Sequence, residues 1–422
     1  MAQPLTPINA SDRVPVIDAL RGFAVLGILF MNVKASSFPY SFEALSVLRF
    51  DWILDKITYW GLEFLISGKF LTMFTFLFGV GMAVQMSRAI AKDNEKQFPM
   101  VYVRRLLLLL IIGFIHEVFV FEGMVLLWYP LMGFLLLLFR KFKPGLMLPM
   151  VFFLILLTPG VTTLWLGLSR PAPPPEQQVR QTTQKQETTK TDEQKAWEGC
   201  SAVIKIYKEG SYTDIVKERL AIVPTTFINT LIVGWYLLGI FMLGTWTWRK
   251  GIFHDIKKHH KFLKTTLLYS LIIGAVFTTT ILLVPFWGSI KSSPLWIYFL
   301  IVVVRWIGIA AFTVFYVSGF LLLYPKAFFK RLVKPIEAVG RAALSNYIFQ
   351  NIIVAFIFYG YGLKLIGDTL PLVNMLICFP IFAIQIPLSV WWMKRYRFGP
   401  LEWLWRTLTY GKRQPMRIKR EV

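Results

Sequence analysis

The first long apolar segment of the chain carries polar residues along one face. It reads RVPVIDALRGFAVLGILFMNV, and Asp18 and Arg21 are three positions apart, so they can pair on a helix. Asn32 follows Arg21 by eleven positions, about three helical turns, and therefore falls on the same face. A cationic helix end can hold a phosphate-bearing ligand, so Asp18 and Arg21 are predicted to bind substrate. Gly22 and Gly27 favour the close approach of a neighbouring helix.

A second apolar segment, RRLLLLLIIGFIHEVFVFEG, repeats this spacing with a histidine. Arg105 and His116 are eleven positions apart and share a helix face, and His116 is the one histidine of the four within an apolar segment. A histidine can act as a general base or accept an acyl group near neutral pH. Glu117 and Glu122 are close enough in sequence to orient it. We therefore predict a catalytic site containing His116, Glu122 and Asn32.

Two later segments also place polar side chains within apolar sequence. Arg305 interrupts IVVVRWIGIA, and GRAALSNYIFQN carries Arg341, Asn346 and Gln350. Asn346 and Gln350 are four positions apart and share a face. Such groups suit an anion site, a polar ligand or an aqueous channel. The predicted substrate-binding residues are therefore Asp18, Arg21, Arg105, Arg305, Arg341, Asn346 and Gln350.

Each of these residues also has a purely structural interpretation. A charge inside a bilayer costs several kcal/mol unless it is paired or hydrated. A buried ion pair or an interhelical hydrogen bond that locks two helices together meets the same need. Arg21 can instead extend to the membrane surface, and His116 can be a hydrogen-bonded histidine that packs two helices.

The composition of the chain requires that these segments lie in a membrane. Of 422 residues, 56% are apolar, 16% aromatic and only 16% charged, and the mean hydropathy is +0.57. Soluble domains are about a quarter charged, so this composition excludes a soluble enzyme, a disordered protein and a fibrous one. Residues 51–67 are amphipathic and are predicted to lie at the interface or to lead into the second span. We predict an all-α polytopic membrane protein with about ten transmembrane helices, near 17–35, 69–88, 102–121, 124–140, 144–167, 226–247, 263–285, 294–323, 345–366 and 371–393.

The basic residues predict the orientation of these spans. The net charge of +23 comes from 46 Lys and Arg against 23 Asp and Glu. Basic residues gather in every second loop and in the C-terminal tail, and ten spans with both termini in the cytoplasm place all of them on the cytoplasmic side. We therefore predict a multi-pass protein of the plasma membrane that contacts the lipid bilayer and binds no nucleic acid.

The chain is predicted to form one transmembrane unit over residues 1–422 with one long extracytoplasmic loop. The loop covers 168–225, and its polar, Pro-rich first part, 168–195, is predicted to be disordered. Its second half has a helical apolar stripe and is predicted to form one or two short helices on the outer face. A C-terminal half, 226–412, and a basic tail, 413–422, follow. Cys200 and Cys378 are isolated from each other and from histidines, so no metal site is predicted.

Several motifs of the chain resemble those of one known family. The first apolar segment is similar to the N-terminal signature of the YeiB-like bacterial membrane proteins, which carry the domain of unknown function 418. The similar stretches cover nearly the whole chain in family order, and 226–412 is the family-specific half. They are KFLTMFTFLFGVG (69–81), the segment around His116, YKEGSYTDIVKERL (207–220), GWYLLGIFMLG (234–244), GRAALSNYIFQN (340–351) and FGPLEWLWRTLTYGK (398–412).

The YeiB-like proteins resemble a wider group of transmembrane acyltransferases that includes heparan-α-glucosaminide N-acetyltransferase and bacterial enzymes that acylate surface sugars. This resemblance implies transfer from cytoplasmic acyl-CoA, with acetyl-CoA the expected donor, to an acceptor at the outer face. The sugar acyltransferases end the first span in a histidine where this chain has Asn32, and the N-acetyltransferases place theirs in a region without histidine here, 33–68. His116 stands where the YeiB-like proteins have their histidine, followed at 122–124 by Glu-Gly-Met in place of the Gly-Asp of many relatives.

Three functions are therefore weighed on the sequence. In the first, an integral membrane acyltransferase binds the phosphates of acyl-CoA at its inner basic ends and uses His116 near the outer face on a sugar, lipid or cell-surface glycan. In the second, a transporter or channel moves a small polar or anionic substrate, although the internal repeats common in transporters are weak here. The third is a non-catalytic membrane scaffold. The sequence leaves the acceptor and a homodimeric state open.

Overall fold

The fold is built from helices throughout the part of the chain that the structure describes. The computed structural model describes residues 13–123, 125–169, 181–284 and 293–418. Short 3-10 turns occur at Tyr40–Phe42, Val47–Arg49 and Leu137–Phe139. The α-helices are α1 (Pro15–Ser37), α2 (Glu43–Ser46), α3 (Ile53–Leu65), α4 (Lys69–Ala91), α5 (Phe98–Phe119), α6 (Val125–Leu136), α7 (Pro144–Ser169), α8 (Gln181–Glu209), α9 (Tyr212–Arg249), α10 (His260–Leu283), α12 (Leu295–Leu323), α13 (Ala327–Arg341), α14 (Ala343–Phe358), α15 (Pro371–Arg395) and α16 (Pro400–Tyr410).

The helices confirm an all-α polytopic membrane protein. Within the described residues, eight helical segments are long and apolar enough to cross a bilayer, and one of these joins α3 and α4 over Ile53–Ala91. The pair α13 and α14 adds a ninth if it is counted as one span, although it is bent by 83°. The shorter apolar helix Val125–Phe139 covers the remaining predicted run. Each of the ten apolar runs read from the sequence therefore coincides with a helix.

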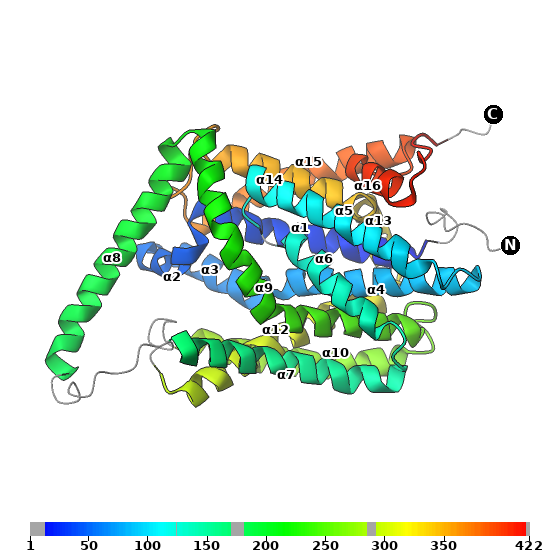
Figure 1. Cartoon of the computed structure of the whole chain (residues 1–422), viewed down its shortest axis with the longest axis horizontal. Coiled ribbons are helices and arrows are strands. Elements are labelled where there is room, and N and C mark those ends of the chain that lie inside the picture. The colour runs from blue at the N-terminus through cyan, green and yellow to red at the C-terminus, as the bar shows by residue number, and fades with distance from the viewer. Residues whose placement is uncertain (1–12, 124, 170–180, 285–292, 419–422) are drawn as a thin grey trace.

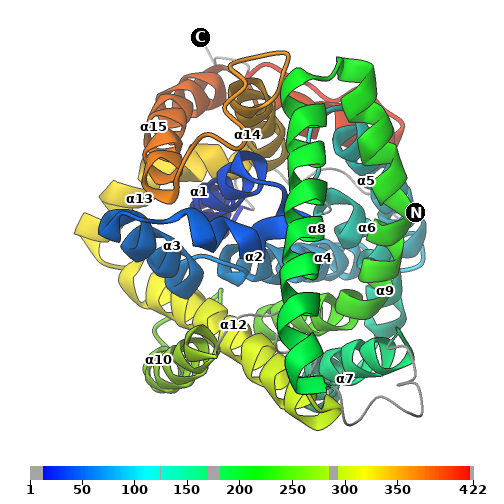
Figure 2. The ribbon, with the colours of Figure 1, turned by 90° about the vertical axis from the view of Figure 1, so that its left-hand side faces the viewer.

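Helix α1 occupies the centre of the bundle. In its most apolar window 72% of the residues are buried, against 17% for α10. One side of α1 contributes Val16, Leu20 and Ile28 to a core shared with α4, α5, α6, α7, α9 and α12, and the other side contributes Val25 and Leu29 to a core shared with α14 and α15. Figure 2 shows α1 inside the bundle and α10 at its edge. Polar groups on α1 are thus shielded from lipid by other helices.

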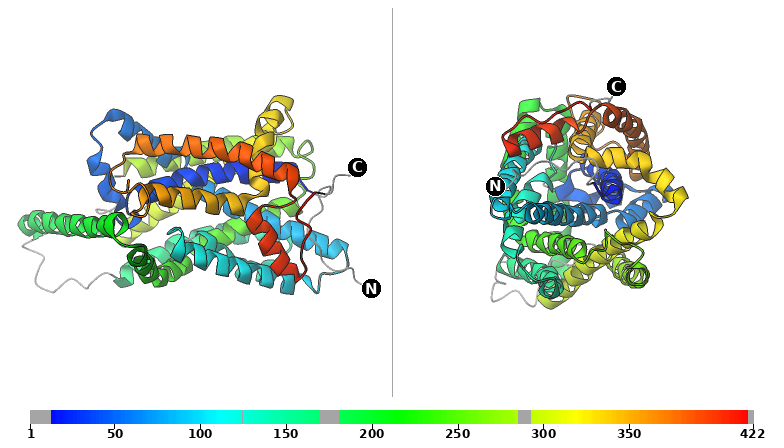
Figure 3. Two further views of the ribbon diagram at one scale, coloured as in Figure 1. Left: turned by 90° about the horizontal axis from the view of Figure 1, so that it is seen from above. Right: turned by 90° about the vertical axis from the view of Figure 1, so that its right-hand side faces the viewer.

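The two ends of the bundle carry different elements. Helices α13 and α16 lie at one end, and α2, α3 and α8 lie at the other (Figure 1). We call the first the inner end and the second the outer end, after the orientation that the basic loops predict. Seen from the inner end in Figure 3 (right), α1 again lies in the middle of the surrounding helices.

The long loop differs from its prediction in part. The sequence predicts disorder over 168–195, whereas the structure has helix α8 from Gln181 onward, and residues 170–180 lie outside the described residues. Gln, Lys and Glu, which dominate this stretch, are good helix formers even where they bury nothing. Helix α8 extends beyond the bundle at the outer end (Figure 3, left).

Helix α9 is longer than the sequence suggests. The sequence predicts a short surface helix and a separate span from 226, but α9 runs unbroken for 38 residues over Tyr212–Arg249. Its start is fixed by a capping box, in which Ser211 Oγ accepts from the Asp214 backbone N–H at 3.3 Å and the Asp214 carboxylate accepts from the Ser211 N–H at 3.0 Å. Pro224 is accommodated within the helix.

Glycines allow a close helix contact between α1 and α13. A methyl group added at Gly340 would lie 1.8 Å from the Asp18 carbonyl oxygen, and one at Gly22 would lie 2.2 Å from the Ile336 carbonyl oxygen. A methyl group added at Gly27 would lie 1.9 Å from the ring of Phe70. The expectation that Gly22 and Gly27 allow close approach is met, and this contact holds the start of α1 against the inner helix α13.

Candidate functional site

Five arginines from separate parts of the chain gather at the inner end. One lies just before α1, and the others lie on α1, α5, α13 and α16; each is half-buried. We call them the inner arginine cluster: Arg13, Arg21, Arg105, Arg341 and Arg406. The members are close enough for their charges to interact. Arg13 interacts electrostatically with Arg21 and Arg341. Arg105 interacts with Arg21, and Arg406 interacts with Arg105 and Arg13. The sequence predicted three of these residues as binding residues, and the fold brings those three together.

Few carboxylates balance this cluster. Asp18 accepts a hydrogen bond from Arg21 at 3.0 Å, and one of its oxygens lies 3.9 Å from Arg13. Glu402 is buried, but it accepts hydrogen bonds from the Leu344 and Ser345 N–H groups and from the Ser345 hydroxyl. Even with both acids ionised, the five guanidinium groups leave an excess of positive charge, which a bound anion would neutralise.

The arginines are held in place by neighbouring groups. The guanidinium of Arg105 lies over the ring of Trp405 at 3.9 Å, and the Trp405 indole donates to the Arg105 carbonyl oxygen at 2.9 Å. Arg406 lies over the ring of Phe398 at 4.8 Å. Burial, together with the charges of Arg105 and Arg13, lowers the pKa of Arg406. Arg341 Nε is buried and has no hydrogen-bond partner among the described residues. The cluster therefore has at least one N–H donor available for a hydrogen bond to a ligand.

A chain of three polar side chains crosses the core further along α1. Asn32 on α1 donates through Nδ2 to Asn351 Oδ1 on α14 at 2.6 Å, and Asn351 Nδ2 lies 2.9 Å from His116 Nε2 on α5. We call this the amide–histidine chain. Its members are 7%, 0% and 1% exposed in this order. The two residues that the sequence predicted as catalytic partners, Asn32 and His116, are therefore linked through a third, Asn351.

The direction of this chain fixes the state of the imidazole. Because Asn351 accepts through its oxygen, it donates to His116 through its amide nitrogen, so Nε2 is an acceptor and a neutral ring carries its proton on Nδ1. Nδ1 is buried and has no partner among the described residues. The oxygen and nitrogen of an amide are distinguished by their hydrogen bonds, so both amides can also be placed the other way round. The hydrogen bonds then run in the reverse direction, and Nδ1 carries a free lone pair.

The predicted acid Glu122 has a different partner from the one expected. Its carboxylate accepts a hydrogen bond from the Tyr207 hydroxyl at 2.9 Å, and burial raises the pKa of Glu122. The neighbouring acid, Glu117, accepts from the Gly123 N–H at 3.1 Å. Arg219, whose side chain is 1% exposed, donates to the Val118 carbonyl oxygen nearby at 3.5 Å. Glu122 therefore attaches the long loop to the end of α5, next to the turn that carries His116.

The inner arginine cluster and the amide–histidine chain are connected by two helices. On α1, Arg21 and Asn32 are eleven residues apart, and on α5, Arg105 and His116 have the same separation. Eleven residues of α-helix rise by roughly 16 Å. Both helices therefore present a cation at the inner end and a polar side chain about 16 Å further toward the outer end.

The other predicted binding residues lie elsewhere. Asn346 donates to Ser389 Oγ at 3.1 Å, and Gln350 donates to Gln385 Oε1 at 2.7 Å, so both make contacts between α14 and α15. The charge of Arg305 on α12 acts on Glu63 and Lys69, near the outer part of α4. These three residues are thus separate from the amide–histidine chain, and the contacts of Asn346 and Gln350 match the structural interpretation.

Three members of these sites were not selected from the sequence. Arg13 and Arg406 lie outside the apolar runs, among many other basic residues. Nothing in the sequence therefore distinguishes them as buried arginines. Asn351 closes the GRAALSNYIFQN segment, one position after Gln350. A search for amides of that span outside the face shared by Asn346 and Gln350 would have found it, but only the fold shows that it meets α1 and α5.

Comparison with known proteins finds relatives of this chain in bacteria. The family described as "Protein of unknown function (DUF418)" matches residues 247–412. The chain is 32% identical to "Uncharacterized protein YxaH" of Bacillus subtilis (strain 168), over 99% of each chain. It is 27% identical to "Uncharacterized protein YeiB" of Escherichia coli (strain K12), over 94% of this chain and 96% of that protein. No solved structure matches it significantly.

Proposed function

We propose a function from the premise that the chain belongs to the DUF418 family, together with YxaH and YeiB. It is an integral membrane acyltransferase that moves an acyl group from acyl-CoA to a hydroxyl or amine acceptor at the outer face. The observation that carries this proposal is the inner arginine cluster, an excess of positive charge on the same two helices that hold His116 and Asn32.

The inner arginine cluster would bind the phosphates of the donor. Guanidinium groups form charge-assisted, often bidentate hydrogen bonds to phosphate oxygens. Arg341, whose Nε has no partner among the described residues, has a donor available for such a contact. With the phosphates held there, the acyl thioester would extend along α1 and α5 for roughly 16 Å, the rise of eleven helical residues, and reach the level of His116.

His116 would handle the proton of the reaction. The thioester C–S bond breaks, an ester or amide bond forms to the acceptor, and the proton of the acceptor passes to the departing sulfur. For His116 to take that proton at Nδ1, Nε2 must be protonated and must donate to Asn351 Oδ1, which is the reversed direction of the amide–histidine chain. Because His116 is 1% exposed, α5 and α14 must move apart to admit the acyl group.

Ligand-dependent thermal stability of the purified protein tests the donor site. A ligand at about a hundred times its dissociation constant stabilises the folded state by roughly 2.7 kcal/mol. Acetyl-CoA and CoA are expected to raise the unfolding temperature, and ATP to raise it less. Arg105→Gln and Arg406→Gln should reduce the shift. The matched control is Lys258→Gln, which removes one exposed cation from the loop before α10.

The outcomes of this experiment separate the alternatives. No shift with any CoA compound would reject the donor site. A shift of equal size with ATP would show that the cluster binds adenine nucleotides in general. A shift that persists in both arginine variants would place the donor elsewhere on the molecule.

A second candidate function is transport of a small anion. It is favoured by charges buried near the outer part of the bundle: Lys34 pairs with Glu63, and the Lys69 ammonium, 2% exposed, donates to the Glu63 carbonyl oxygen at 2.6 Å. Ionisable groups inside a membrane commonly line ion pathways. Flux of an anion into proteoliposomes without an acyl donor, lost in Lys69→Met, would support this function over acyl transfer.

A further inference from the structure

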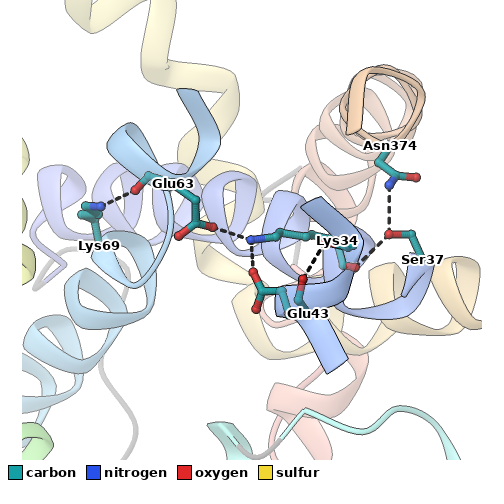
Figure 4. Close-up of polar contacts among 7 residues, drawn as sticks. Lys34, Ser37, Glu43, Glu63, Lys69 and Asn374 are labelled. Carbon is teal, nitrogen blue, oxygen red and sulfur yellow. Dashed lines mark hydrogen bonds and ion pairs between the residues drawn. The ribbon is translucent and has the colours of Figure 1, made fainter. Parts of the chain in front are cut away.

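A pocket at the outer end is separate from both sites described above. It encloses about 60 Å³ and is lined by the last turns of α1, the segment 43–50, α3 and the start of α15. Figure 4 shows part of its lining, with Lys34 and Ser37 from α1, Glu43, and Asn374 from α15. A water occupies roughly 10–15 Å³ by this measure, so the pocket has room for about four to six such groups.

The charged groups of the pocket are already neutralised or bonded. Lys34 forms ion pairs with both Glu43 and Glu63 (Figure 4), and its ammonium lies 4.6 Å from the centre of the Tyr59 ring. Arg49 donates to the Gly367 carbonyl oxygen. Since these cations have partners within the protein, the pocket does not require an anion.

Two neutral polar atoms of the lining are left without partners. Thr369 Oγ1 and Asn374 Oδ1 are buried, and neither has a hydrogen-bond partner within the described residues. The orientation of the amide is fixed, because Asn374 Nδ2 donates to Ser37 Oγ at 2.9 Å and Ser37 donates to the Lys34 carbonyl oxygen at 2.8 Å. Asn374 therefore presents an acceptor and Thr369 a hydroxyl, two complementary partners for hydroxyl groups of a ligand.

The remaining walls are mostly apolar, and in the orientation that the basic loops predict they lie at the level of the outer membrane surface. Phe30, Phe38, Phe50 and Met375 line the pocket. The adjacent helix α3 exposes an apolar face, given by Trp52, Ile53, Ile57 and Trp60, which are 41–60% exposed. Tryptophan is enriched where lipid headgroups meet the hydrocarbon. The pocket is therefore next to the lipid headgroups of the outer leaflet.

From these features we propose that the pocket binds the uncharged polyol head of a membrane amphiphile, such as a glycerol- or sugar-type headgroup. Neighbouring hydroxyls of the ligand bind Asn374 Oδ1 and Thr369 Oγ1, and its apolar part lies along the aromatic wall toward the lipid. This binding uses neither the inner arginine cluster nor His116. It stands whether the protein transfers acyl groups or transports a substrate.

Equilibrium binding in phosphatidylcholine nanodiscs tests the proposal. The probe is radiolabelled 1-monooleoylglycerol, and empty nanodiscs give the background. We expect saturable binding of one molecule per chain, weakened at least tenfold by Thr369→Val and by Asn374→Leu and retained in Thr369→Ser. Thr280→Val, which changes an exposed threonine of α10, is the matched control.

Competition identifies the chemistry and the source of the ligand. Methyl oleate, which has no hydroxyl, and oleic acid, which is anionic, should not displace the probe. Displacement by free glycerol at comparable concentration would support a polyol site that takes soluble ligands. Equal competition by methyl oleate or oleic acid, or undiminished binding in the Thr369→Val variant, would overturn the proposal.

Discussion

The imidazole of His116 is oriented by one hydrogen bond and by packing against the rings of Phe121 and Tyr347. Its Nε2 meets only Asn351 among the described residues, and Asn351 is in turn oriented by Asn32. This arrangement resembles the way a second group commonly fixes the tautomer of a catalytic histidine. Single substitutions along the amide–histidine chain should therefore act on chemistry and on stability to different extents.

The first prediction concerns His116 and Asn351. In proteoliposomes supplied with labelled acetyl-CoA, His116→Ala should lower transfer to membrane acceptors by about 100-fold or more. Asn351→Asp keeps an acceptor for Nε2–H and should retain more activity than Asn351→Leu, which keeps none. Full transfer by His116→Ala, with an unchanged unfolding temperature, would remove this residue from the mechanism.

The second prediction concerns Glu122 and pH. Because burial raises the pKa of Glu122 above its unfolded value, the folded state binds this proton more tightly than the unfolded state. Its contribution to stability is therefore present below the unfolded pKa, about 4.3, and is lost as pH rises through the folded pKa. The unfolding temperature should fall with pH over this window more steeply in the wild type than in Glu122→Gln. The exposed acid Glu209 serves as the control, since Glu209→Gln should leave the slope unchanged.

At the residue scale, the sequence predicts which polar residues belong to a site better than it predicts their hydrogen-bond and ion-pair partners. Spacing on one helix correctly placed Asp18 beside Arg21, because three residues bring side chains together on any helix. It did not indicate that Asn32 reaches His116 through Asn351, since that contact joins residues 319 positions apart. Lys34 was overlooked because both of its acids lie outside the predicted spans: Glu63 is in the stretch 51–67, which was treated as interfacial, and Glu43 precedes that stretch.

The contact between α1 and α13 is the point where one element positions the others. Helix α13 is bent by 83° from α14, and its glycine Gly340 packs on the backbone of α1 beside Asp18. Arg341 follows directly, so this contact also sets one member of the inner arginine cluster. A change in this helix contact is therefore expected to move Arg341 and, with it, the anion site proposed above.

The third prediction follows from that contact. Gly340→Ala would bring a methyl group to 1.8 Å from the Asp18 carbonyl oxygen, so the two helices must separate. Overpacking of this kind costs about 1–3 kcal/mol, which thermal unfolding in detergent should report as a lower unfolding temperature. Gly145→Ala on α7 is the control, because nothing lies within 4 Å of the added methyl. Equal effects of the two substitutions would contradict the packing argument.

At the element scale, apolar length predicts helices but not their ends or bends. Each of the ten runs overlaps a helix within the described residues, because an apolar segment in a bilayer must satisfy its backbone internally, although the run 345–366 is helical only as far as Phe358. Helices were predicted for the second half of the long loop, but neither the start of α8 at Gln181 nor the unbroken continuation of α9 from Tyr212 into the span was predicted, because polar sequence outside a membrane carries no such constraint. The bend between α13 and α14 lies at Ala342, two residues after Gly340, and was not predicted either.

The distribution of charge along the whole molecule gives a testable orientation. The loop before α10 and the outer helix α8 lie on opposite sides of the membrane if the basic loops are cytoplasmic. The native thiols, Cys200 and Cys378, are buried, so they give little background in labelling experiments.

The fourth prediction uses this low background. A membrane-impermeant maleimide added to intact bacteria should label Lys205→Cys on α8 but not Lys257→Cys, and both positions are exposed. Labelling of Lys257→Cys should appear only after the cells are permeabilised. Labelling of both variants from outside would place the two loops on one side and reject the ten-span topology.

The central place of α1 has a consequence for biosynthesis. Asn32 is made early, whereas its partner Asn351 follows 319 residues later. At about 5–20 residues per second, the ribosome needs roughly 16–64 s to supply that partner. Throughout this interval Asp18 and Lys34 already have early partners in Arg21, Glu43 and Glu63, whereas the Asn32 amide does not yet have its partner on the later helix. Asn32 must therefore be shielded from lipid by the insertion machinery or by other early helices, and a chain that stops before α14 would leave this amide without Asn351.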